Sequence, residues 1–176
     1  MKGENKMSEF TDCYHLRTDN QEEGISLLKR TGLKGYIFPA ANGWVTLVSE
    51  KYDFEENEEL IKENEGILLH FVYGDDHGWY FTVYEKEKEI CHYSNMWEEE
   101  IEDDSRFDEE YIYKLIQENE SKDREIEREE LQSILEDPQE FADLIGLTNY
   151  EWISYHYIDM ESERGEDVYE GVIKIE

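Results

Sequence analysis

Cysteine and histidine are the residues of this chain best suited to metal binding or nucleophilic catalysis. They occur close together twice, as Cys13-x-His15 and as Cys91-His92. Together these four side chains are the ligand types of a Cys2His2 zinc site. Both pairs fall in predicted strands, where neighbouring side chains point to opposite faces of the sheet. Cys91 and His92 therefore cannot easily bind one metal ion, and we expect no metal site.

A nucleophilic role for Cys91 beside a histidine is chemically feasible. A reactive thiolate needs a positive environment, which lowers the pKa of the thiol. The chain instead carries 47 acidic and 17 basic residues, a net charge of −30. The sequence therefore favours buried, structural cysteines and predicts no cofactor.

The other candidates for acid–base chemistry have simpler explanations. His70 lies between two apolar residues of a predicted strand, which is typical of a partly buried sheet histidine. Asp75-Asp76-His77 could bind a cation, but it lies between two glycines at a predicted hairpin tip, where such residues are common. The sequence contains no nucleotide-binding, serine-hydrolase or zinc-protease motif. It favours a non-catalytic protein over an enzyme.

Negative charge is concentrated in the second half of the chain. Residues 1–95 carry ten basic and 19 acidic side chains, whereas residues 96–176 carry seven and 28. Nucleic-acid binding needs stripes of Lys and Arg, and anionic membranes repel such a chain. We therefore expect neither nucleic acid nor membrane as a partner. A basic protein partner is compatible with the charge.

We expect a non-catalytic, acidic protein-binding module, comparable with an immunity protein or antitoxin that inhibits a basic nuclease. Long-range attraction would raise its association rate in a salt-dependent way. The predicted contact combines an aromatic anchor with the carboxylates that follow it. It consists of Trp97, Glu98, Glu99, Glu100, Glu102, Asp103 and Asp104.

The alternative is a small-ligand-binding protein or an enzyme, with a pocket between the sheet and the C-terminal helices. The predicted lining consists of Tyr84, His92, Tyr93 and Trp97. A deep pocket with converging His, Asp and Cys side chains would favour this class, whereas a filled core would favour the binding module. A third interpretation is that the acidity serves solubility alone.

The stretch Gly66–Asn95 gives the strongest prediction of secondary structure. Two apolar and aromatic runs flank the turn GDDHG, and a charged turn leads to a third run. This pattern predicts three consecutive antiparallel strands. A further strand is predicted at Cys13–Arg17, and Asn42-Gly43 predicts a type I′ hairpin turn upstream.

The first half of the chain contains two similar segments. Each has a D-x-x-E capping box, at Asp19 and at Asp53, followed by an apolar pair and a Gly-Trp dipeptide. We predict an α+β fold with a single domain and a mostly antiparallel sheet built from two αββ units. The element order suits a ferredoxin-like βαββαβ arrangement plus an extra hairpin, followed by acidic C-terminal helices.

Two halves of one domain are expected. Residues 7–95 would form the duplicated sheet half, and residues 96–176 the mainly helical C-terminal half packed on it. Lys-Gly-Glu shortly before Met7 can encode a bacterial ribosome-binding sequence, so we expect translation to start at Met7 and residues 1–6 to be a disordered leader. With two cysteines, no secretory signal and no membrane-length apolar run, a cytoplasmic bacterial protein is expected.

Both faces of the central predicted strands are apolar or aromatic, so each face needs a cover. The helices of the two αββ units can cover one face only. The C-terminal helices are the expected cover of the other. A second copy of the chain is the alternative, so we expect a monomer, or a homodimer formed through that second face.

Overall fold

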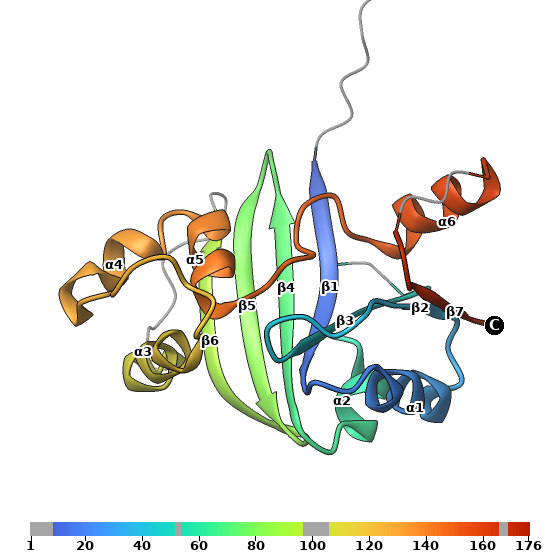
Figure 1. The fold of residues 1–176 in the computed structure, drawn as a ribbon, viewed down its shortest axis with the longest axis horizontal. Coiled ribbons are helices and arrows are strands. Elements are labelled where there is room, and N and C mark those ends of the chain that lie inside the picture. Colours follow the sequence, from blue (N-terminus) through green and yellow to red (C-terminus); the bar gives the residue numbers. More distant parts are fainter. Residues whose placement is uncertain (1–8, 52–53, 97–105, 166–168) are drawn as a thin grey trace, which may run out of the picture.

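The computed structural model describes residues 9–51, 54–96, 106–165 and 169–176. Its described part is a single antiparallel sheet of seven strands with helices on both faces (Figure 1). The predicted α+β class and antiparallel sheet are therefore confirmed. The strands are β1 (Phe10–Arg17), β2 (Gly35–Ile37), β3 (Trp44–Ser49), β4 (Ile67–Gly74), β5 (Gly78–Glu85), β6 (Lys88–Met96) and β7 (Ile173–Ile175).

Strand β1 lies in the centre of the sheet, in the order β6-β5-β4-β1-β3-β2-β7. On one side β1 pairs with β4 over almost its whole length, and on the other it pairs with β3 from Tyr14 onward. Before Tyr14, where β1 does not pair with β3, a segment distant in sequence lines this edge of β1. There the Asp12 N–H donates to the Ile153 carbonyl at 2.9 Å. Polar residues on β1 are therefore enclosed on both edges.

Six helices and a short 3₁₀ turn lie in the described part of the chain. Their ends follow capping chemistry, and Asp108 and Asp137 cap α3 and α5 as the sequence predicted. The helices are α1 (Gln21–Thr31), α2 (Glu58–Glu63), α3 (Glu109–Glu118), α4 (Leu131–Ile134), α5 (Pro138–Ile145) and α6 (Tyr155–Glu163).

The prediction that the two D-x-x-E boxes, at Asp19 and at Asp53, cap α1 and α2 is wrong. Asn20 caps α1 by accepting from the Glu22 N–H at 3.1 Å, and Asn57 caps α2 by accepting from the Leu60 N–H at 3.2 Å. Asn and Asp cap equally well. In a chain so rich in acidic residues, the D-x-x-E spacing also arises by chance.

The Asn42-Gly43 turn is confirmed, since both residues have positive φ (52° and 81°) and Ala41 pairs with Trp44. Counted back from this turn, the sequence predicts Leu47 opposite Phe38, but Leu47 pairs with Ile37, so the register differs by one residue. Pro39 predicts an edge strand, because proline cannot donate to a sheet, but β7 pairs with β2 on its outer side.

The first face of the sheet is covered by α1 and α2. Their buried side chains Ile25, Leu27, Leu28 and Leu60 pack against the β1, β3 and β4 side chains of the same core cluster. We call this side of the sheet the first face. Both helices of the predicted αββ units therefore lie on one side.

The second face is covered by α3, α4 and α5, which lie on the β5–β6 side of the sheet in Figure 1. The main apolar core lies there, between the sheet and these helices. The expected cover by the C-terminal helices is therefore present. The same packing occupies the face through which we had expected a homodimer.

The segment 148–158, which fits both a strand and a helix by sequence, becomes a helix only from Tyr155. Ser154 caps α6 by accepting from the Tyr157 N–H at 3.3 Å. The residues before it form the irregular connection that passes beside β1. This connection matters for the site below.

Candidate functional site

The two sites predicted from sequence fare differently. The predicted partner contact, Trp97 to Asp104, lies outside the described residues, as does the predicted leader 1–6. Of the predicted pocket, Tyr84 and His92 lie on the first face of the sheet. Tyr93 lies on the second face, where its hydroxyl donates to the Leu135 carbonyl at 3.1 Å. These pocket residues do not converge.

Aromatic rings fill the space between the sheet and the C-terminal helices. The rings of Phe81 and Phe141 stack with centroids 4.5 Å apart, and both side chains are fully buried. Trp79 packs against both rings. A filled core at this place favours the binding class of function over the pocket class.

Cys13, His15 and Thr46 form a buried polar row on the second face. The Cys13 sulfur lies 3.2 Å from His15 Nε2, and His15 Nδ1 lies 2.9 Å from the Thr46 hydroxyl. Burial, with a smaller effect of Asp12, raises the pKa of Cys13 well above its usual value. Burial, together with His70, lowers the pKa of His15 to about 3. Both groups are therefore neutral at pH 7, and no reactive thiolate forms.

His15 should make the protein sensitive to acid. The unfolded chain binds a proton at His15 below about pH 6.5, whereas the folded protein does so only near pH 3. The stability contributed by neutral His15 is thus fully present above about pH 6.5 and is lost as the pH falls toward 3, by at most about 1.4 kcal/mol per pH unit.

We therefore expect His15→Gln to weaken the pH dependence of stability in this acidic range. The measurement is urea unfolding of both proteins at a series of pH values between about 6.5 and 4. The carboxylates contribute equally to both proteins, so the difference in slope isolates His15. Equal slopes would contradict the prediction.

Cys91 is buried as well, and its pKa is raised to about 11, mainly by burial. Both cysteines are free and buried, as the sequence predicted. In the described part of the chain, no cluster of three or more His, Cys, Asp or Glu side chains could hold a metal ion. Cys13, His15, Cys91 and His92, which all lie within the described residues, are therefore not gathered into one such cluster.

On the first face, Asp12 and His70 form a buried hydrogen-bonded pair. Asp12 Oδ1 lies 2.7 Å from His70 Nε2, and both side chains are almost fully buried. The His70 ring stacks on Tyr14, with centroids 4.1 Å apart and planes 2° from parallel. His70 Nδ1 has no hydrogen-bond partner among the described residues.

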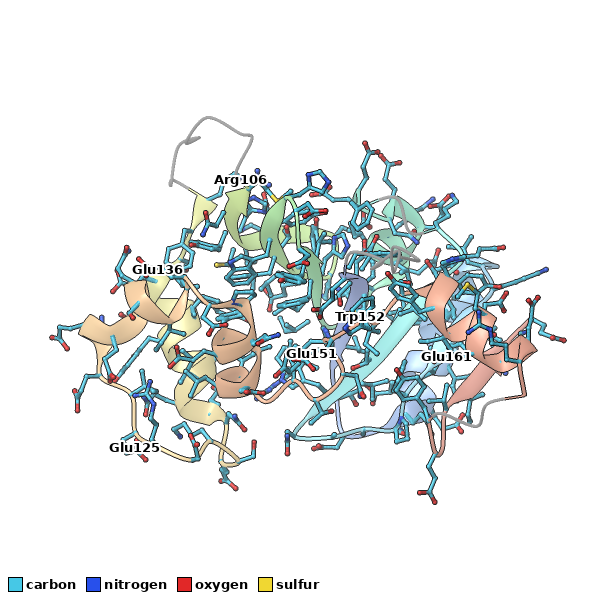
Figure 2. The ribbon with its side chains drawn as sticks, turned by 90° about the horizontal axis from the view of Figure 1, so that it is seen from above. Arg106, Glu125, Glu136, Glu151, Trp152 and Glu161 are labelled. Atoms are coloured by element: carbon cyan, nitrogen blue, oxygen red, sulfur yellow. The ribbon has the colours of Figure 1, made fainter. Side chains whose placement is uncertain are left out.

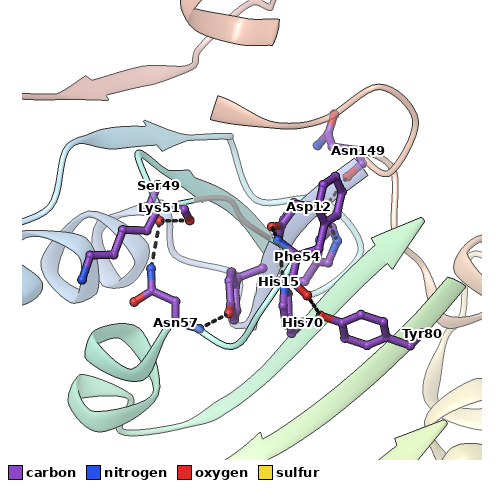
Figure 3. Close-up of polar contacts among 11 residues, drawn as sticks. Asp12, His15, Ser49, Lys51, Phe54, Asn57, His70, Tyr80 and Asn149 are labelled. Carbon is purple, nitrogen blue, oxygen red and sulfur yellow. Dashed lines mark hydrogen bonds and ion pairs between the residues drawn. The ribbon is translucent and has the colours of Figure 1, made fainter. Parts of the chain in front are cut away.

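The same carboxylate holds the loop before α2. Asp12 Oδ2 accepts from the Phe54 N–H at 3.0 Å, and the Tyr80 hydroxyl donates to the Phe54 carbonyl (Figure 3). Hydrogen bonds to both its N–H and its carbonyl thereby hold Phe54 at a φ of 64°. Left-handed backbone at a bulky residue is strained by about 1–3 kcal/mol and persists only where the surroundings enforce it.

A second contact holds the far end of this loop. The Tyr14 hydroxyl accepts from the Asn57 N–H at 2.8 Å, and the Asn57 side chain donates to the Ser49 hydroxyl at 3.0 Å. Asn57 is also the cap of α2. The loop between Phe54 and α2 therefore rests on polar side chains of the sheet.

The fixed loop presents the Phe54 ring at the surface, where it joins a chain of aromatic contacts. Ring centroids are 5.4 Å apart for Phe54 and Phe10, 4.5 Å for Phe10 and Tyr157, and 5.6 Å for Tyr157 and Trp152. Phe54 is 43% exposed and Trp152 is 42% exposed. Trp152 also has a positive φ, of 55°. The exposed ends of this aromatic chain are thus both held in strained backbone.

Carboxylates flank these rings. Glu9 and Glu151 directly precede Phe10 and Trp152 in the chain, and Glu151 and Trp152 lie side by side before α6 in Figure 2. Partial burial raises the pKa of Glu9, and the nearby charges of Glu151 and Asp75 add to this shift. Glu151 and Asp75 therefore lie close enough to Glu9 to disfavour its charged form.

We call these residues the aromatic–acidic surface. Its members are Phe10, Phe54, Trp152, Tyr157, Glu9, Asp75 and Glu151. Beside Phe54, a hollow of about 640 Å³ at the start of α2 extends the negative charge. This hollow is lined by Glu50, Lys51, Glu55, Glu56, Asn57, Glu58 and Glu59.

No protein-family model, curated protein or solved structure matches the chain. None of the helices in the described ranges has the length and apolar character needed to cross a membrane. Function must therefore be argued from the charge and from the aromatic–acidic surface.

Proposed function

We propose that the protein is a non-catalytic acidic binding module, of the immunity or inhibitor kind, for a basic protein partner. The observation that carries this proposal is the aromatic–acidic surface, where Phe54 and Trp152 are exposed in strained backbone beside repelling carboxylates. Exposed aromatic rings are the usual anchors of protein interfaces. The net charge of −30 would attract a basic partner over a long range.

The strained backbone and the solvent exposure of Phe54 and Trp152 both support this proposal. The fold holds two large rings in solvent and in an unfavourable backbone conformation, which lowers the stability of the free protein. A partner that covers these rings removes apolar surface from water without first having to order the loop at Phe54. Such preorganisation raises affinity. A cytoplasmic location and a monomeric state fit the proposal.

The test compares Trp152→Ala with Ile173→Ala. Ile173 is a comparably exposed apolar side chain (39%) on β7, away from the aromatic–acidic surface. Each immobilised protein is incubated with a bacterial lysate at low and at high salt, and captured proteins are identified by mass spectrometry. We expect a basic protein that wild type and Ile173→Ala capture at low salt. Trp152→Ala should capture it about 30-fold more weakly, as expected for an interface hot spot of about 2 kcal/mol.

Equal capture by the two variants, or no captured basic protein at low salt, would sink the proposal. Capture that does not weaken at high salt would also contradict it, because the attraction is electrostatic. Phe54→Ala serves as a second variant at the same surface. Its ring is exposed, so the fold should survive the substitution.

A finer description of the fold belongs with this proposal. We propose that β1, α1, β2, β3, α2 and β4 form a ferredoxin-like unit that arose by duplication of an αββ segment. Two observations support it: these strands lie in the order β4-β1-β3-β2, and α1 and α2 pack in one core cluster on one face. Both helices also have an asparagine cap, Asn20 and Asn57.

A further inference from the structure

We infer that the aromatic–acidic surface binds an arginine side chain of the basic partner, with the guanidinium on the Trp152 ring and close to the Glu151 and Glu9 carboxylates. The inference rests on the proposed function and names the group that is recognised. The chain's own cations show which groups this fold places around a positive charge.

Three cations among the described residues lie over aromatic rings. The Arg17 guanidinium carbon is 4.8 Å from the centre of the Trp44 ring, and that of Arg128 is 4.9 Å from the Tyr113 ring. The Lys174 ammonium is 5.7 Å from the Tyr36 ring. Such a position is favourable because the face of an aromatic ring is negative.

Each of these cations also has a carboxylate partner. Arg17 lies 3.7 Å from Glu118, and Lys174 lies 3.7 Å from Asp159. Arg128 pairs with Glu110 through both guanidinium nitrogens. A site in which a cation lies close to both an aromatic ring and a carboxylate therefore recurs in this fold, and we call such a site a cation seat.

The aromatic–acidic surface has the same two components, rings and carboxylates. None of the ion pairs between described residues involves Glu9, Asp75 or Glu151. The Asp75 N–H donates to the Glu9 carbonyl at 3.0 Å, which places the two residues side by side. Partial burial raises the pKa of Glu9, the charges of Glu151 and Asp75 add to the rise, and a bound cation would relieve their repulsion. Glu9 is also close enough to Tyr157 to act on its hydroxyl. The aromatic rings and the carboxylates of this surface therefore lie close together.

The chemistry of the seat favours arginine over lysine. A guanidinium is planar, stacks on a ring face and still offers donors in its plane to two carboxylates. It is also more weakly hydrated than an ammonium, so it loses less on contact with Phe54 and Trp152. In the three seats above, both guanidinium carbons lie closer to their ring centres than the lysine ammonium does.

The test uses two synthetic peptides of equal length and charge, one of alternating arginine and glycine and one of alternating lysine and glycine. Their affinities for the full chain are measured by calorimetry, and the indole signal of Trp152, assigned by its loss in Trp152→Ala, is followed by NMR. We expect the arginine peptide to bind about tenfold more tightly than the lysine peptide and to shift the Trp152 signal. Trp152→Ala should remove this preference, Trp152→Phe should retain part of it, and Ile173→Ala should leave it unchanged.

Equal affinity for the two peptides would overturn the inference while leaving the salt-dependent capture of a basic protein untouched. An arginine preference that survives in Trp152→Ala would also overturn it, because the seat would lie elsewhere. Circular dichroism of each variant confirms that it is folded.

Discussion

Replacement of Asp12 by alanine is expected to lower the free energy of unfolding by about 2–4 kcal/mol, because it leaves two buried hydrogen-bonding groups without a partner. Asp12 is 5% exposed and accepts from Phe54 while lying 2.7 Å from His70. Its removal would leave His70, which is fully buried and already lacks a described partner at Nδ1, with neither ring nitrogen bonded. The Phe54 N–H would lose its acceptor too. The strained loop would then lose one of the two hydrogen bonds that clamp Phe54.

The measurement is the urea midpoint and slope at pH 7 for wild type, Asp12→Ala and Asp12→Asn. Asparagine keeps an oxygen that can accept from the Phe54 N–H, so Asp12→Asn should lose clearly less stability than Asp12→Ala. Tyr80→Phe removes the other clamp of Phe54 and should cost about 1 kcal/mol. A loss below about 1 kcal/mol in Asp12→Ala would show that Asp12 and His70 contribute nothing as a pair.

Replacement of Phe141 by alanine is expected to cost about 3–5 kcal/mol and to destabilise the whole described fold. Phe141 is fully buried, stacks on Phe81 and contacts Trp79, and so joins α5 to the sheet. Because the second face would otherwise expose its aromatic side chains to water, sheet and C-terminal helices should unfold in one cooperative step.

Unfolding followed by near-UV and far-UV circular dichroism should therefore give coincident transitions in wild type and in Phe141→Ala. Phe54→Ala is the matched control, because it removes the same ring from an exposed position and should cost much less. A double-mutant cycle with Phe81→Ala should show a coupling of about 0.5–1.5 kcal/mol between the two rings. Two separate transitions would mean that the C-terminal helices fold as an independent unit.

Local sequence signals predicted much of this fold. The strands around Gly66–Asn95 follow directly from alternating bulky residues and turn residues, and the caps at Asp108 and Asp137 follow from helix-terminus chemistry. The need for a cover on each sheet face followed from side-chain alternation alone. These features depend on residues that are close together in the chain.

The aromatic–acidic surface could not be found in this way. Its carboxylates, Glu9, Asp75 and Glu151, come from segments that meet only in the folded sheet. The positive φ of Phe54 and Trp152 has no signal in their residue types, since aromatic residues rarely adopt it. The polar contacts of Phe54 with Asp12 and Tyr80 enforce this backbone at one position, and they are tertiary contacts. The sequence prediction placed the partner contact at the densest acidic run, residues 97–104, which lies outside the described residues.

The pairing of β1 with the connection before α6 has a consequence for the order of folding. Thr11 donates to the Tyr150 carbonyl 139 residues further along the chain, whereas β4, β5 and β6 pair through short turns. Contacts between distant residues form late, because the intervening chain must first be ordered. We therefore expect the contacts from Trp152 through Tyr157 to Phe10 to form late in folding. A partner that needs Trp152 would then distinguish fully folded chains from partly folded ones.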